Sequence, residues 1–207
     1  MSSGRHSRKG RPVDAAKHEA IIAAAVRAFF DDGFAAASIE QIAASAGVSK
    51  VTVYNQFGDK RGLFTAAVEA ECNRMQTYFS IDTSAGATLR DRLRNIGTGM
   101  VAFLSRPEMI QFERRIAAET VAEPEIGAAF LAAGPHRMKK AFAQFLRALA
   151  KAGDVEIEDF DLAAEQFASM CKGMGDLERR FGAAVDPQRD RDRLEAAVEV
   201  FCRAYGR

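Results

Sequence analysis

The sequence has little of what several classes of protein depend on. Its 207 residues include three cysteines, five prolines and no tryptophan, and the formal net charge is +1. Cys72, Cys171 and Cys202 are far apart and odd in number. We therefore expect free thiols in a reducing compartment rather than a disulfide framework. Scarce proline, abundant alanine and the lack of long apolar–polar alternation favour an all-helical chain.

Long apolar runs are also missing. No N-terminal segment has the apolar core of a signal peptide, and no stretch is long and apolar enough to cross a membrane. We therefore expect a cytoplasmic protein without a membrane partner. Because the net charge is close to zero, any binding to nucleic acid must depend on basic side chains at particular positions rather than on an overall positive charge of the protein.

Recognisable catalytic patterns are absent as well. The sequence contains no HExxH, GxSxG or phosphate-binding loop, and no Cys/His spacing typical of zinc. His18 is expected on the surface of the first helix, and His136 follows Gly134-Pro135 at a helix start. We expect no catalytic residue, no metal and no cofactor, with a helical enzyme as the disfavoured alternative.

Glycine, proline and N-cap residues divide the chain into about nine expected helices. They cover residues 14–32, 39–46, 50–57, 59–79, 88–104, 107–120, 124–152, 159 or 161 to 181, and 188–205, with an interruption at Gly134-Pro135. Residues 1–13 form a basic arm, expected to be either a flexible terminus or an arm that reaches DNA. The expected fold is an N-terminal three-helix domain, residues 14–58, followed by a larger helical bundle, residues 59–207, with helix 59–79 linking the two.

The stretch SIEQIAASAGVSKVTVYNQF, residues 38–57, predicts two short helices joined by a tight turn. Ser38 and Ser49 are good N-caps, Gly47 permits a left-handed turn, and Ala43 is small where the helices would cross. This pattern is typical of a helix-turn-helix, although any tight helical hairpin would share it. The outward residues of the second helix include no acid and suit phosphates and base edges: Lys50, Val51, Thr52, Tyr54, Asn55 and Gln56.

This segment resembles the DNA-binding domain of the TetR (tetracycline-repressor-like) family of bacterial regulators. The matching pieces are AFFDDGF at 28–34, the stretch at 38–57 quoted above, and DKRGLF at 59–64. The remainder matches in length and helix count, and it is broadly similar to the AefR-type subgroup. Gly62 departs from the family pattern, where Glu is frequent, and we interpret it as softening the hinge after the DNA-binding domain.

The resemblance implies a set of contacts with double-stranded DNA. Lys50, Val51 and Thr52 would face base edges. Lys60 would bind phosphate at the start of the fourth helix. The complete predicted set is Ser38, Ser49, Lys50, Val51, Thr52, Tyr54, Asn55, Gln56 and Lys60. Asn55 and Gln56 stand where Arg and His are common, which predicts weaker salt dependence than in a more basic relative.

The implied function is a ligand-released repressor that binds a palindromic operator as a homodimer. An activator of the same fold is an open alternative. A DNA-compacting protein without a sensor is disfavoured, because it would need a more basic surface. The predicted dimer interface lies on the last two helices. Their apolar stripes are expected to divide between the chain's own core and the partner, with a purely internal core as the alternative: Met174, Leu177, Phe181, Leu194, Ala197, Val198, Phe201 and Tyr205.

The many methionine and phenylalanine residues between 88 and 181 predict a cavity for a small apolar or aromatic effector. A solid core is the alternative for each residue, and Glu119, His136, Gln166 and Asp176 are further polar candidates. The predicted lining is Met100, Phe103, Met109, Phe112, Arg115, Phe130, Met138, Phe142, Phe167, Met170 and Met174.

Overall fold

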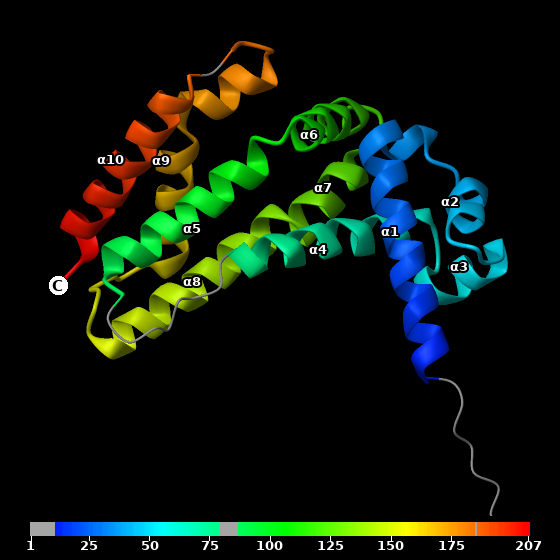
Figure 1. The fold of residues 1–207 in the computed structure, drawn as a ribbon, viewed down its shortest axis with the longest axis horizontal. Coiled ribbons are helices and arrows are strands. Elements are labelled where there is room, and N and C mark those ends of the chain that lie inside the picture. Colours follow the sequence, from blue (N-terminus) through cyan, green and yellow to red (C-terminus); the bar gives the residue numbers. More distant parts are fainter. Residues whose placement is uncertain (1–10, 79–86, 185) are drawn as a thin grey trace, which may run out of the picture.

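The computed structural model describes residues 11–78, 87–184 and 186–207, and this part of the chain is built from α-helices (Figure 1). The expected all-α fold is confirmed. The helices are α1 (Arg11–Ala36), α2 (Ile39–Ser45), α3 (Lys50–Phe57), α4 (Lys60–Tyr78), α5 (Leu89–Leu104), α6 (Pro107–Glu119), α7 (Pro124–Ala133), α8 (Pro135–Ala152), α9 (Phe160–Arg180) and α10 (Pro187–Tyr205). Residues 1–10 of the expected basic arm lie outside the described residues.

The helix boundaries follow local signals closely. Ser38 and Ser49 accept hydrogen bonds from the backbone N–H groups of Gln41 and Thr52, as N-caps do. The expected segment 124–152 becomes α7 and α8, because Gly134 has non-helical angles and Pro135 opens a new helix. Helix α1 continues past the predicted end, but Gly33 bends it with a φ of 85°.

Two apolar clusters fill the described part of the chain. The first joins α1, α2, α3 and α4 to residues of α6 and α7, and it includes Phe29, Phe64 and Phe112. The second packs α5, α8, α9 and α10 together around Phe167 and Phe201. Figure 1 shows α2 and α3 at one end of the molecule and α9 and α10 at the other. The predicted boundary after residue 58 therefore crosses the first cluster rather than separating two cores.

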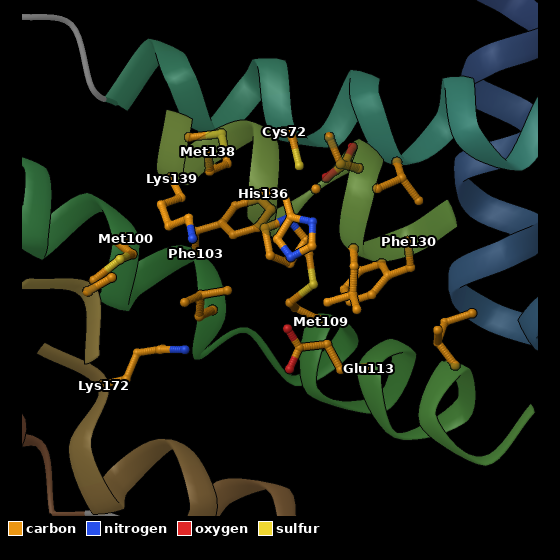
Figure 2. A pocket seen from close by; sticks show the side chains of 18 of the residues that line it. Cys72, Met100, Phe103, Met109, Glu113, Phe130, His136, Met138, Lys139 and Lys172 are labelled. Atoms are coloured by element: carbon orange, nitrogen blue, oxygen red, sulfur yellow. The ribbon is translucent and has the colours of Figure 1, made fainter. Parts of the chain in front are cut away.

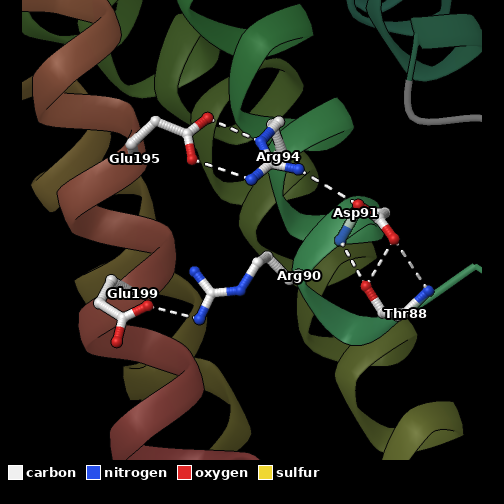
Figure 3. Close-up of polar contacts among 6 residues, drawn as sticks. All are labelled: Thr88, Arg90, Asp91, Arg94, Glu195 and Glu199. Atoms are coloured by element: carbon white, nitrogen blue, oxygen red, sulfur yellow. Dashed lines mark hydrogen bonds and ion pairs between the residues drawn. The ribbon is translucent and has the colours of Figure 1, made fainter.

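Helix α10 is fixed against α5 by both apolar and charged contacts. A Cβ at Gly97 would lie 2.3 Å from Leu194 Cδ1, so this glycine allows the two helices to approach closely. Arg94 donates two hydrogen bonds to Glu195 at 2.6 and 2.9 Å, and Arg90 pairs with Glu199 (Figure 3). The bidentate pair lowers the pKa of Glu195. These contacts hold α10 in one orientation.

That orientation corrects half of the predicted dimer interface. Leu194, Ala197, Val198 and Phe201 are buried in the chain's own second cluster, with Phe201 fully covered. The prediction that they face a partner is wrong, because α5 and α9 already cover this side of α10. Tyr205 also packs within the chain, where its hydroxyl donates to Gln166 Oε1 at 2.7 Å.

The α9 part of the predicted interface remains exposed. Helix α9 is interrupted at Gly173, whose φ is 47°, and the segment beyond it presents its apolar side chains to solvent. Met174 is 60% exposed and Phe181 is 83% exposed, and Leu177 is also exposed. On the outer side of α10, Val200 is 52% exposed.

Two features are absent from the described ranges. No helix there is long and apolar enough to span a bilayer. No three His, Cys, Asp or Glu side chains there form a group able to hold a metal ion.

Candidate DNA-binding surface and effector cavity

The predicted helix-turn-helix is present in α2, the turn and α3. Ile42, Ala43 and Val53 are buried where the two helices cross. Gly47 has a φ of 66°, a conformation that glycine adopts readily, and Val48 N–H then donates to Ala43 O at 3.0 Å. The turn is therefore fixed by local backbone bonds, and it leaves one face of α3 open to solvent.

The open face of α3 carries several of the predicted DNA contacts. Val51 is 66% exposed, and Tyr54 and Asn55 are also exposed. Lys50 lies over the Tyr54 ring, 5.6 Å from its centroid. A methyl-bearing side chain, a phenol, an amide and an ammonium group thus occupy one surface. Such groups suit base edges and phosphate oxygens.

Other predicted contacts are engaged within the chain. Thr52 Oγ1 lies 2.9 Å from Ser49 Oγ, so both hydroxyls share a hydrogen bond at the start of α3. His18 Nδ1 donates to Gln56 Oε1 at 2.9 Å, and the His18 ring stacks on Phe57. Gln56 therefore contacts α1.

Lys50 and Ser38 both contact Glu40 on α2. Lys50 Nζ forms an ion pair with Glu40 Oε1, and Ser38 Oγ donates to Glu40 Oε2 at 3.0 Å. The hydrogen bond from Lys50 is the main reason that the pKa of Glu40 falls to about 2. The carboxylate thus neutralises the only cation on the open face of α3 among the described residues.

Lys60 lies at the N-terminus of α4. Its Nζ donates to Ala35 O at 3.1 Å and lies 4.7 Å from the Phe34 ring centroid, and partial burial lowers its pKa. Gly62 has a packing role that corrects the interpretation as a soft hinge. A Cβ at Gly62 would lie 2.1 Å from Phe57 O, so any side chain there would push α3 away from α4.

A cavity of about 720 Å³ lies between the helices of the C-terminal bundle. Such a volume suits a drug-sized ligand. Eight of the predicted lining residues do line it: Met100, Phe103, Met109, Phe112, Phe130, Met138, Phe142 and Phe167. Figure 2 shows Cys72 of α4 and Glu113 of α6 on opposite sides, with His136 between them.

Three predicted lining residues lie elsewhere. Met170 packs into the second apolar cluster, and Met174 is exposed beyond the bend at Gly173. Arg115 points from α6 to the end of α1 instead of into the cavity. The common reason is helix rotation, because residues only a few positions apart on one helix face different neighbours.

Arg115 and Glu119 together form what we call the α6 latch. Arg115 Nη1 donates to Phe30 O at 2.7 Å and also to Asp31 O. Glu119 Oε2 accepts from Phe34 N–H at 3.1 Å. The cation thus binds the carbonyl end of a helix, where cations are favoured. A Cβ at Gly33 would lie 2.5 Å from Glu119 Oε1, so the latch fits closely around this bend.

Charged groups line the cavity alongside the apolar ones. Glu71 has a side chain only 4% exposed, and its oxygens lie 2.8 Å from Arg74 and 3.3 Å from Arg106. Glu113 lies 2.9 Å from Arg180. Burial raises the pKa of Glu113 while Arg180 opposes this shift, and burial raises the pKa of Cys72 to about 11.

Two family comparisons match this architecture. Residues 21–67 match the family described as bacterial regulatory proteins, tetR family. Residues 91–207 match the AefR-like transcriptional repressor, C-terminal domain, which is more than half of the chain. The chain belongs to the TetR family. As a TetR-family transcriptional regulator it is a DNA-binding protein, and the resemblance seen in residues 28–64 is confirmed.

Individual proteins show the same relationship. A TetR-family regulator from Mesorhizobium loti is 29% identical, with 96% of this chain and 100% of that chain covered and a TM-score of 0.78. The flavonoid-responsive regulator FrrA is 30% identical, with 93% and 98% covered and a TM-score of 0.73. The HTH-type regulator YdeS of Bacillus subtilis is 41% identical over 54 residues. This match covers 26% of this chain and 27% of YdeS, so the chain spans only about a quarter of the length of YdeS.

Sequence reasoning missed part of this TetR-family cavity. Phe30 of α1 and Val68, Glu71 and Cys72 of α4 also line it. The sequence offered one signal, which is that Glu71 interrupts an otherwise apolar stripe on α4. Nothing in the sequence indicates that Phe30 reaches a cavity, because it lies in the same apolar stripe as the core residue Phe29.

Proposed function

We propose that this TetR-family regulator is a ligand-released repressor that binds a palindromic operator as a homodimer. One α3 helix contacts too few base pairs for useful specificity, and a two-fold dimer places two such helices about 34–36 Å apart, one turn of DNA. The predicted DNA contacts on α2, α3 and α4 belong to this proposal. Because the proposed partner is chromosomal DNA, we place the protein in the cytoplasm.

The observation that carries the proposal is a cavity wall shared with the DNA-binding end. Phe30 belongs to α1 and lines the cavity, and its ring stacks on Phe112 of α6 at 4.0 Å with only 2° between the planes. A ligand that separates these rings would also move α1 relative to α6. Since α1 packs on α2, this movement would change the spacing of the two α3 helices in a dimer.

The proposed dimer uses the exposed apolar faces of α9 and α10. Leu177 on α9, Phe181 directly after α9 and Val200 on α10 are available for a partner. These helices lie at the end away from α2 and α3 (Figure 1), so a partner there leaves both α3 helices free. An isologous interface of this kind gives the two-fold symmetry that a palindrome requires.

We propose a small aromatic effector, in keeping with the phenylalanine-rich lining. The related regulator FrrA is described as flavonoid-responsive. FrrA and this chain are similar along nearly their whole lengths, so a flavonoid is a reasonable first probe. By reciprocity, a ligand that weakens DNA binding must bind more weakly to the DNA complex.

Fluorescence anisotropy with the DNA upstream of the gene tests the proposal. A scrambled duplex at the same salt is the control. We expect saturable binding that favours the upstream duplex, two subunits or a multiple per site, and release on addition of the flavonoid naringenin. Tyr54→Ala should weaken binding to both duplexes without loss of helix content. Equal affinity of the wild type for both duplexes would contradict operator recognition.

A further inference from the structure

The charged groups that line the cavity balance one another. The lining includes three carboxylates, from Glu71, Glu113 and Glu165. It also includes three cationic groups, from Lys139, Lys172 and Arg180, so these formal charges sum to zero. The described lining residues therefore carry no excess charge that would favour an ionised ligand, although they offer several strong hydrogen-bonding groups.

The charged groups of the lining differ in how many hydrogen bonds and ion pairs they make. Glu165 is paired with Lys139 at 2.9 Å, and Glu71 is held by two arginines. Glu113 is paired through one oxygen with Arg180 at 2.9 Å. Among the described residues, Lys172 has no hydrogen bond or ion pair of its own, although its charge acts on nearby Glu113. These two groups thus keep unused hydrogen-bonding capacity.

Both groups reach the same space. Figure 2 shows Glu113 extending from α6 and Lys172 extending from α9 into the cavity, next to Phe103 and Met109. The Glu113 side chain is only 14% exposed, so a charge on a bound ligand would interact with it in a poorly screened environment. The rings of Phe103 and Phe112 also line this cavity.

We propose that the effector is a neutral aromatic compound carrying a hydroxyl group, and that this hydroxyl binds between Glu113 and Lys172. A hydroxyl donates one hydrogen bond and accepts others, so it can donate to the Glu113 carboxylate and accept from the Lys172 ammonium. A ligand carboxylate would be attracted by Lys172 but repelled by Glu113, and a ligand ammonium would be attracted by Glu113 but repelled by Lys172, so neither ion suits both groups. This inference rests on the proposed ligand-responsive function and specifies the chemistry of its ligand.

The test uses four biphenyls that share one ring system. They are 4,4′-dihydroxybiphenyl, biphenyl, biphenyl-4-carboxylate and 4-(aminomethyl)biphenyl in its ammonium form. Binding to the full-length protein without DNA is measured by isothermal titration calorimetry near neutral pH. We expect the diol to bind at least about tenfold more tightly than either ion, because each ion loses its hydration on entering the cavity and is repelled by one of the two groups while the other attracts it.

Two substitutions should change this preference in opposite directions. Glu113→Gln removes the repulsion toward the carboxylate, so biphenyl-4-carboxylate should gain about tenfold in affinity. Lys172→Met removes the repulsion toward the ammonium ligand, so 4-(aminomethyl)biphenyl should gain by a similar factor. Both variants should bind the diol more weakly. The matched controls are Glu125→Gln and Lys140→Met, which alter exposed residues outside the cavity.

Unfolding of a variant cannot produce this result, because it would lower the affinity for every ligand, whereas each variant is expected to bind a different ion more tightly. The proposal is overturned if either ion binds wild type as tightly as the diol, if the diol shows no binding at millimolar concentration, or if neither variant changes the ion preference. Because the titrations contain no DNA, they test the ligand proposal independently of operator binding. A chain that binds the diol but no operator would contradict only the repressor function.

Discussion

At the scale of single residues, the ion pair between Lys50 and Glu40 bears directly on the proposed DNA contacts. Lys50 is the predicted base-reading cation of α3, yet in the free protein its ammonium group pairs with a carboxylate on α2. DNA binding must separate this pair or bring the carboxylate toward phosphate. In the proposed complex Glu40 therefore opposes binding to any DNA, and the operator has to supply contacts that compensate.

Glu40→Gln should raise the affinity for both the upstream and the scrambled duplex, by about threefold at low salt, because it removes a negative charge beside the phosphates. Because this charge effect does not depend on sequence, the ratio of specific to nonspecific affinity should stay the same. Anisotropy titrations at several salt concentrations would measure both effects. The matched control is Glu158→Gln, an exposed acid in the loop before α9. Unchanged or weaker binding by Glu40→Gln would contradict this account.

At the scale of helices, the α6 latch connects the cavity to α1 of the DNA-binding end. Phe112 of α6 lines the cavity, while Arg115 and Glu119 on the same helix bind the end of α1. A helix is stiff over two turns, so displacement of Phe112 is transmitted to both latch residues. Helix α6 therefore joins the cavity to α1 in addition to α4, the linking helix predicted from the sequence.

Glu119→Leu should lower the free energy of unfolding by about 1–3 kcal/mol, because it leaves the partly buried Phe34 N–H without its acceptor. It should also weaken operator binding, because α1 is no longer held against α6. Glu119→Gln keeps an acceptor oxygen, so the free energy of unfolding and the operator affinity should both fall much less. Urea unfolding and DNA anisotropy provide the two readouts. Equal effects of Leu and Gln would show that the hydrogen bond is unimportant.

Adjacent residues on α10 should behave in opposite ways. Phe201 is fully buried, so Phe201→Ala should destabilise the fold by about 3–5 kcal/mol. Val200 is 52% exposed on the proposed dimer face, so Val200→Glu should give folded monomers. Sedimentation velocity reports the oligomeric state, and circular dichroism reports the fold. A dimer that survives both Val200→Glu and Leu177→Glu would place the interface elsewhere.

At the scale of the whole molecule, the DNA-binding unit lacks an independent core. Phe29 and Phe34 pack on Phe64 of α4, and Phe30 packs on Phe112 of α6. The three N-terminal helices therefore bury their apolar faces partly against the C-terminal bundle. A change in the packing of the bundle alters the surroundings of α1, as the proposed ligand release requires.

A fragment of residues 1–58 should consequently lack a stable fold. It loses α4 and α6, and with them the contacts that bury the phenylalanines of α1. Far-UV circular dichroism with thermal melting would measure this, with the full chain as reference. We expect low helix content and no cooperative transition for the fragment. A cooperative melt of the fragment would show that residues 1–58 fold alone.

The sequence by itself determined the features that depend on neighbouring residues in the chain. The caps at Ser38 and Ser49, the turn at Gly47 and the break at Gly134-Pro135 are local, so helix boundaries and the helix-turn-helix could be predicted. Only the tertiary structure decided which way each helix faces. Phe201 lies in the core, Arg115 binds α1 and Phe30 lines the cavity because of helices distant in sequence. An apolar stripe shows that a face is buried, but its partner depends on how the whole chain packs.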